Sequence, residues 1–194
     1  MKKIAIFASG TGTNAQKIID HFRDKPNVCI ALIVSNKPDA GVLNIAESEN
    51  IPTMILDREK FFRGNAYADE LTSIGIDLVV LAGFLWKIPS ALIQAFPQSI
   101  INIHPALLPK HGGKGMYGHF VHDAVITSGD TETGITIHYV DELFDHGNNI
   151  FQTSVPVTAD DNAASIAGKV QLLEHQYYPR VIDFLLQDQL NHTS

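Results

Sequence analysis

The fold is decided by the stretch Ile4-Ala5-Ile6-Phe7-Ala8-Ser9-Gly10-Thr11-Gly12-Thr13-Asn14-Ala15, in which an apolar run passes through a glycine loop into an amphipathic segment. Continuous apolar runs are typical of strands in a parallel sheet that is covered on both faces. Glycine lets the backbone turn tightly between such a strand and the helix that follows. The stretch therefore predicts a strand, a turn and a helix, which is the opening of an α/β fold.

The alternation of apolar runs and amphipathic segments continues through the first half of the chain. We expect strands at residues 4–8, 28–34, 53–56, 78–81 and 100–103, and helices at residues 14–22, 41–49, 66–74 and 90–96. Regular alternation of this kind predicts an α/β fold with a doubly wound, mostly parallel sheet and helices on both of its faces.

The pattern changes after His104. A loop rich in glycine and proline is expected at residues 105–118, then a helix at 119–128, antiparallel strands at 134–140 and 150–157, and a last helix at about 163–190. Pro179 lies inside that last segment and is a candidate for a break or kink. Because no stretch has the composition of a linker, we expect a single domain over residues 1–194, with halves of about 1–100 and 101–194.

Charge and composition disfavour several classes of protein. The formal net charge is -7, whereas nucleic-acid binding needs a basic footprint. No segment approaches the roughly 20 apolar residues of a membrane span, and the apolar run at residues 4–8 is too short for a secretory signal. Cys29 is the only cysteine, so no internal disulfide can form. We expect a soluble, cytoplasmic protein with neither nucleic-acid nor membrane partners.

The glycine loop at residues 9–15 is a candidate phosphate site, because a helix N-terminus and close-lying glycine amides favour an anion. Its spacing also fits the dinucleotide fingerprint, but that motif needs an acid at the end of the second strand, where this chain has Val34-Ser35-Asn36-Lys37. The Gly-Lys-Ser/Thr of nucleoside triphosphate loops is absent too. A monophosphate fits best, and the alternative is a plain strand-to-helix turn capped by Thr or Asn.

The segment Asn102-Ile103-His104-Pro105 places two polar side chains on one face of an apolar strand. Both could donate to the oxyanion of an acyl transfer, and the alternative is a hydrogen-bonded pair in the core. A charged His104 would need a nearby carboxylate. Asp145, in the run Asp145-His146-Gly147, is a candidate, and a plain turn aspartate is the alternative.

Nine histidines raise the question of a metal site, but the chain has no His-Glu-x-x-His motif and no cysteine cluster. His119 and His122 could share one helix face, although a surface or locally bonded pair is favoured. No serine lies in a Gly-x-Ser-x-Gly elbow. We therefore expect neither a metal nor a covalent nucleophile.

Several segments, in order along the chain, resemble the glycinamide ribonucleotide formyltransferases of purine synthesis. They are Ser9-Gly10-Thr11-Gly12-Thr13-Asn14, Leu81-Ala82-Gly83-Phe84, Asn102-Ile103-His104-Pro105-Ala106-Leu107-Leu108-Pro109-Lys110, residues 134–140 with Asp145-His146-Gly147, Val155-Pro156-Val157, and Glu174-His175 with Tyr178-Pro179. The run around His104 with its downstream Asp-x-Gly is specific to formyl-transferring folate enzymes. Glu174-His175 indicates the glycinamide ribonucleotide branch.

The resemblance implies transfer of the formyl group of 10-formyltetrahydrofolate to the amine of N1-(5-phospho-D-ribosyl)glycinamide, a step of de novo purine (IMP) biosynthesis. The first half would hold the substrate phosphate at Gly12, Thr13 and Asn14, with Glu174 on the ribose. The second half would carry the chemistry, with His104 as general acid, Asn102 as second donor, and Asp145 raising the pKa of His104 and moving protons through water.

The resemblance also implies that the folate co-substrate lies between the segment Leu85-Trp86-Lys87-Ile88 and the turn that begins at Val140 and Asp141, with Asn102 close by. The implied partners are small molecules alone, with no metal, and the chain would be a monomer or homodimer.

The chain departs from the family at positions associated with the glutamate tail of folate. An Arg commonly follows Leu-Ala-Gly-Phe, where this chain has Leu85-Trp86-Lys87-Ile88, and another is replaced by Gly64, with Arg63 beside it. Lys87 or Arg63 would have to substitute. The loop at residues 111–118 is longer than in familiar members, and is either a lid over the substrate or an ordinary mobile loop.

Three other functions stay open at this point. They are formyl transfer to initiator methionyl-tRNA, which the acidic charge balance disfavours, hydrolysis of the same formyl folate, and non-catalytic binding of a phosphate ligand.

Overall fold

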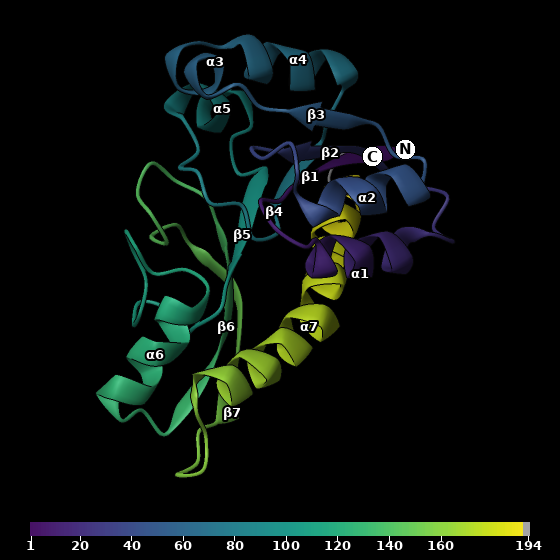
Figure 1. Ribbon diagram of the computed structural model, residues 1–194. Helices are drawn as coiled ribbons and strands as arrows, with labels where there is room; N and C mark the ends of the chain where they lie inside the picture. Colours follow the sequence, from purple (N-terminus) through teal and green to yellow (C-terminus); the bar gives the residue numbers. More distant parts are fainter. Residues whose placement is uncertain (192–194) are drawn as a thin grey trace. The chain divides into compact units, whose positions relative to one another are not determined.

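Strands and helices alternate along the first half of the chain, as the sequence predicts. The computed structural model describes residues 1–191 and separates into two units, Met1–Asn102 and the part from Ile103 onward. The elements up to the border are β1 (Lys2–Phe7), α1 (Thr13–Phe22), β2 (Val28–Ser35), α2 (Gly41–Ser48), β3 (Thr53–Ile55), α3 (Arg58–Arg63), α4 (Ala66–Ile74), β4 (Leu78–Leu81), α5 (Ser90–Ala95) and β5 (Ile100–His104) (Figure 1).

The strands of the first unit are parallel neighbours in the order β3-β2-β1-β4-β5. β1 lies in the middle, and its residues Ile4, Ala5, Ile6 and Phe7 are all 0% exposed. Burial of every side chain, on both faces, explains why the strand is apolar without alternation. The helices α1 and α2 pack on β2.

The helix α3 is a difference from the sequence-based expectation, which placed no element at residues 58–63. It is short and largely polar, with Phe61 as its buried residue, so hydrophobic periodicity gives little signal. Its N-cap was nevertheless visible in the sequence, because Asp57 is a favoured capping residue and its side chain accepts a hydrogen bond from the Lys60 amide.

The second unit contains α6 (His119–Ser128), β6 (Glu132–Tyr139), β7 (Asn149–Pro156) and α7 (Ala163–Asn191). β6 and β7 form an antiparallel pair, and α7 packs against both strands and against α6. The predicted fold class, a mostly parallel α/β sheet with antiparallel strands toward the C-terminal end, is confirmed. The single-domain organisation stays a prediction.

The last helix does not end at Pro179, which lies inside it. The helix begins after Asn162, whose side chain caps it by accepting a hydrogen bond from the Ser165 amide at 3.0 Å. Tyr178 and Ile182 on either side of Pro179 are 0% exposed, and this packing supports the helix where the proline removes a hydrogen bond. Within residues 1–191, no helix combines the length and apolar character that crossing a membrane requires.

Candidate active site

The glycine loop after β1 lies where the strand order of the first unit reverses, with β2 and β3 on one side of β1 and β4 and β5 on the other. Ligands of open α/β sheets bind at such a switch point, beside the carboxyl ends of the strands. The loop is tied to the end of β4, because the Ser9 amide donates to the Gly83 carbonyl at 3.1 Å and the Leu85 amide donates to Ser9 Oγ at 2.9 Å. The predicted phosphate loop thus lies at the edge where this fold binds ligands.

Gly12 allows the loop to enter α1. Its φ is +82°, in the left-handed region that favours glycine, and a Cβ at this position would lie 2.8 Å from Val42 Cβ. Gly12 is the N-cap residue of α1 and makes no side-chain cap, and the helix begins with Thr13 and Asn14. The positive end of the helix dipole therefore faces the loop, as an anion site requires.

The acid of dinucleotide-binding sites is replaced here by an amide with a structural role. Asn36 follows β2, and its Oδ1 accepts a hydrogen bond from Ser9 Oγ at 2.6 Å. This contact fixes the start of the glycine loop and leaves no carboxylate at the position that would hold a ribose.

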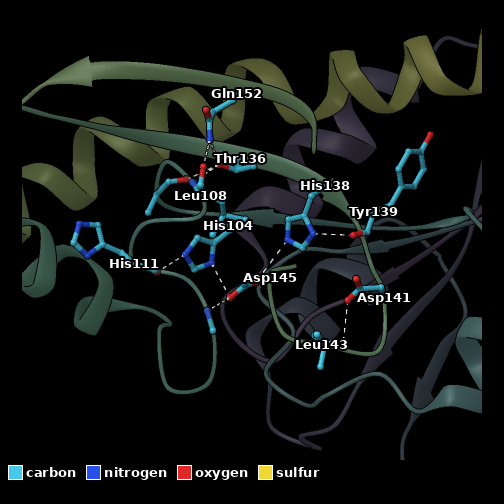
Figure 2. A network of polar contacts seen from close by, with 12 residues as sticks. His104, Leu108, His111, Thr136, His138, Tyr139, Asp141, Leu143, Asp145 and Gln152 are labelled. Carbon is cyan, nitrogen blue, oxygen red and sulfur yellow. Dashed lines mark hydrogen bonds and ion pairs between the residues drawn. The ribbon is translucent and has the colours of Figure 1, made fainter. Parts of the chain in front are cut away.

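In the second unit, Thr136 on β6 holds the segment that follows β5. Its hydroxyl donates to the Ala106 carbonyl at 2.7 Å and accepts from the Leu108 amide at 3.0 Å and from Gln152 Nε2 at 2.8 Å (Figure 2). These contacts use the one donor and both acceptors of a hydroxyl group. The backbone beside His104 is thereby fixed by buried hydrogen bonds.

His104 ends β5, is 3% exposed, and has an acceptor on each side of its ring (Figure 2). Its Nε2 lies 2.8 Å from the carbonyl oxygen of His111, and its Nδ1 lies 3.5 Å from Asp145 Oδ2. A carbonyl oxygen can only accept, so Nε2 carries a hydrogen and donates it. The carboxylate on the other side favours a second proton on Nδ1.

Asp145 lies in the connection between β6 and β7 with a φ of +52°, a strained value for a residue with a side chain. Its Oδ2 accepts from the Gly113 amide at 3.0 Å, and its Oδ1 lies 3.6 Å from His138 Nε2. Two residues on, a Cβ at Gly147 would overlap the Tyr139 carbonyl, so this close turn requires glycine. The sequence-predicted pair His104 and Asp145 is thus brought to ion-pair distance.

Burial and charge act in opposite directions on this pair. Burial lowers the pKa of His104 below its ordinary value, while the charge of Asp145 and the His111 carbonyl act to raise it. For Asp145, burial acts to raise the pKa, but contact with His138, the charge of His104 and the Gly113 amide together hold it below its ordinary value. Asp145 therefore acts to raise the pKa of His104, as expected, but the effect of burial is larger and the pKa of His104 is lowered overall.

Two residues of this network were missed in the sequence. His138 contacts Asp145, and alternation along β6 could have found it, because Thr136 and His138 share a face just as Asn102 and His104 do. His111 contributes its backbone carbonyl, for which a side-chain pattern offers no signal.

The predicted folate segment of the first unit is partly built into an aromatic cluster. Trp86 packs 5.6 Å from Phe61 and 5.5 Å from Phe62 between ring centroids, and Ile88 is 4% exposed. Leu85, at 45% exposed, could meet a ligand. In this segment, Trp86 and Ile88 are thus packed against the protein, while the apolar Leu85 side chain is accessible to a ligand.

The two candidate cations for the glutamate tail are both exposed. Arg63 Nη1 is paired with the Glu59 carboxylate on the same helix at 2.6 Å, whereas Lys87 lies on the segment Leu85-Trp86-Lys87-Ile88 itself.

The remaining predicted residues are divided between the units. Val140 and Asp141 begin the turn after β6, where Asp141 accepts from the Leu143 amide at 2.8 Å and contacts His146 Nδ1 at 2.8 Å. Glu174 is half-buried on α7 in the second unit, whereas Asn102 is half-buried on β5 at the end of the first.

The histidines form no metal centre in the part of the chain that is described, where no group of at least three His, Cys, Asp or Glu side chains could hold an ion. His119 is exposed with its ring centroid 4.0 Å from that of Phe120, while His122 is 7% exposed. The two therefore do not share an exposed helix face.

Comparisons with known proteins agree with one another. A family model described as formyl transferase matches residues 2–182. A phosphoribosylglycinamide formyltransferase of Haemophilus influenzae is 38% identical and aligns over 98% of this chain and 90% of its own length. A chloroplastic phosphoribosylglycinamide formyltransferase of Arabidopsis thaliana is 40% identical over 97% of this chain and 67% of its own length.

Solved structures give the same result. The crystal structure of a phosphoribosylglycinamide formyltransferase from Bacillus halodurans has a TM-score of 0.85 and 35% identity, and the match covers 95% of each chain. Because the family model and these relatives cover nearly the whole sequence, the chain belongs to the formyl transferase family, among the phosphoribosylglycinamide formyltransferases.

Proposed function

We propose that the chain transfers the formyl group of 10-formyltetrahydrofolate to the amine of N1-(5-phospho-D-ribosyl)glycinamide, giving formylglycinamide ribonucleotide and tetrahydrofolate in de novo purine biosynthesis. The observation that carries the proposal is the buried His104 with the Asp145 carboxylate 3.5 Å from its ring, in a chain whose relatives are named for this reaction. The relatives favour this function over hydrolysis, tRNA formylation and non-catalytic binding.

In the proposed reaction the substrate amine attacks the formyl carbon and a carbon–nitrogen bond forms. The carbonyl electron pair moves to oxygen, where hydrogen bonds would come from the Asn102 amide and from Nδ1–H of the protonated His104 ring, because Nε2–H is bonded to the His111 carbonyl. The intermediate then collapses: the bond from the formyl carbon to folate nitrogen breaks, and that nitrogen takes up a proton. Asp145 would accept the proton lost by the amine, through water.

The substrate phosphate would bind at Gly12, Thr13 and Asn14, at the N-terminus of α1. The folate ring would be bound largely by backbone groups of the segment Leu85-Trp86-Lys87-Ile88 and of the turn at Val140 and Asp141, with Lys87 or Arg63 near the tail. We further propose a cytoplasmic monomer or homodimer that uses no metal.

One assay tests the proposed activity. Purified protein is mixed with 10-formyltetrahydrofolate, with and without glycinamide ribonucleotide, and the appearance of tetrahydrofolate is followed. We expect product only when the amine is present, and a loss of at least about 10² in kcat for His104→Ala. Product without the amine would indicate a hydrolase, and no product under either condition would indicate a binding protein.

Glu174→Ala tests the ribose contact. We expect the KM for glycinamide ribonucleotide to rise about tenfold with little change in kcat, because the lost hydrogen bonds act equally on bound substrate and transition state. Gln176→Ala, an exposed neighbour on α7, is the control. An unchanged KM would remove Glu174 from the site.

A further inference from the structure

The segment from His111 to Gly113 is held at three points around the site, and the His111 side chain makes one of these contacts. The His111 ring Nε2 lies 2.6 Å from Asp130 Oδ2, the His111 carbonyl accepts from His104, and the Gly113 amide two residues on donates to Asp145. The His111 side chain is 12% exposed and the Asp130 side chain 16% exposed, so this ion pair is largely shielded from water. The His111–Asp130 contact is thus linked to the pair His104 and Asp145 through a single residue, His111, whose carbonyl contacts His104.

The backbone of His111 needs such an anchor. Its φ is +54°, in the left-handed region that residues with a Cβ rarely adopt. That conformation directs the His111 carbonyl at His104 Nε2 while the ring reaches Asp130. Loss of the ring contact would remove the one side-chain contact described for His111 that helps to offset this unfavourable φ, and the carbonyl would be held less firmly at His104.

Asp130 is itself fixed by a rigid helix end. Gly129, with a φ of +66°, ends α6, and the Gly129 amide donates to the Ile126 carbonyl at 3.1 Å. Lys110 Nζ binds the other carboxylate oxygen of Asp130 at 2.8 Å. Contacts with His111 and Lys110 hold the pKa of Asp130 below its ordinary value, so the carboxylate stays charged.

We propose that Asp130 is a positioning residue for His104 that acts through His111: by holding the His111 ring, it keeps the His111 carbonyl on His104 Nε2. This inference rests on the proposed role of His104 as the acid of formyl transfer. It assigns no contact between Asp130 and substrate.

The proposed link acts on the protonation of His104. Burial, His138 and the charge of His111 lower the pKa of His104, whereas the Asp145 charge and the His111 carbonyl raise it, and His122 on α6 faces it as well. Loss of the carbonyl removes one of the two contributions that favour the protonated ring. The acid form would then be lost at a lower pH.

The variants Asp130→Ala and His111→Asn test the link from both sides. Asn tolerates a positive φ but lacks the ring that reaches Asp130. We expect each variant to lower kcat/KM about tenfold at neutral pH and to move its alkaline limb to lower pH, because that profile reports groups of the free enzyme. The double variant should be no worse than either single one, since both remove the same contact.

Glu132→Gln is the matched control. Glu132 borders the same cavity of about 390 Å³ as Asp130 and His111, so the variant removes a negative charge there without removing the ion pair. We expect kcat/KM to stay within about twofold. The proposal would be overturned if Asp130→Ala had the same kcat/KM as Glu132→Gln. It would also be overturned if the losses in kcat/KM of the two single variants multiplied in the double variant.

A measurement without turnover separates this inference from the proposed function. The ¹⁵N shifts of the His104 ring, followed by NMR against pH, should show the Asp130→Ala ring losing its proton at lower pH than the unaltered protein. Asp130→Asn, which retains an oxygen facing His111, replaces the alanine variant where the latter does not fold, and a smaller shift in the same direction is expected. An unchanged His104 titration in folded variants contradicts the positioning role, whether or not the protein transfers formyl groups.

Discussion

At the scale of single residues, one imidazole is subject to opposing effects. His104 is buried, which favours its neutral form, yet general-acid catalysis needs the protonated form. Asp145 provides the opposing charge at 3.5 Å. A negative oxygen developing on the substrate would add a second negative charge beside the ring. His104 would therefore hold its proton most strongly in the transition state, where that oxygen has to be stabilised.

Removal of the carboxylate should therefore change both rate and pH dependence. Asp145 raises the pKa of His104, so in Asp145→Asn this pKa falls further and the acid form disappears at lower pH. We expect kcat to drop by about 10² and the alkaline limb of kcat/KM to move to lower pH. Rates measured across pH test this, with Asp123→Asn, an exposed carboxylate on α6, as the control. An unshifted limb would separate Asp145 from the protonation of His104.

Two buried threonines of β6 allow a matched test of the network beside His104. Thr136 makes hydrogen bonds with Ala106, Leu108 and Gln152, whereas the Thr133 hydroxyl has no hydrogen-bond partner among the residues described. Thr136→Val should lower the free energy of unfolding by about 2 kcal/mol, because it leaves buried backbone groups unsatisfied. Thr133→Val should be neutral or stabilising. Denaturant titrations compare the two, and equal losses would show that the network adds no stability.

The sequence predicts those site residues whose position follows from local geometry. Asn102 and His104 share a strand face by alternation, and Asp145 precedes a glycine in a turn. It could not predict the His111 carbonyl, since backbone groups leave no residue-type signal. Nor could it predict the Asp130 contact, which depends on a φ of +54° at His111.

At the scale of elements, the glycine loop before α1 depends on one backbone conformation. In Gly12→Ala the new Cβ would lie 2.8 Å from Val42 at a φ of +82°, so both sterics and strain oppose it. We expect a loss of about 2 kcal/mol in unfolding free energy and a raised KM for the phosphorylated substrate. Gly10→Ala is the control for stability, because its Cβ would meet nothing within 4 Å. Equal stability of the two variants would contradict a steric requirement at Gly12.

Elements with strong periodicity were predicted closely, and the misses have physical causes. The helix at residues 66–74 and the strand at 78–81 match α4 and β4, because apolar spacing and a flanking glycine define them. α3 was missed because it is short and polar. Pro179 does not end α7, since the buried side chains around it outweigh the lost hydrogen bond, a tertiary effect that local propensity does not contain.

At the scale of the whole molecule, acid should destabilise the protein in two stages, because two kinds of group have lowered pKa values. Burial lowers the pKa of His104 and His122. Below about pH 6.5 these two rings therefore bind protons in the unfolded chain but not in the folded chain, and the free energy of unfolding falls. Hydrogen bonds and ion pairs lower the pKa of several carboxyl groups on both units: Glu49 (to about 2), Asp130, Asp145 and Asp161. Their contribution is present above the unfolded value of about 4 and is lost below it.

The denaturant midpoint should therefore fall first between about pH 7 and pH 5, and again below about pH 4. The side chains of Glu49, Asp145 and Asp161 are 18%, 11% and 6% exposed, so all three are partly shielded from water and contribute to the second stage. His122→Gln removes one titrating group and should flatten the first stage without changing the second. A midpoint that stays constant from neutral pH to pH 5 would mean that these two rings are hydrated enough to accept protons in the folded protein, and the low-dielectric surroundings assigned to His104 would then be wrong as well.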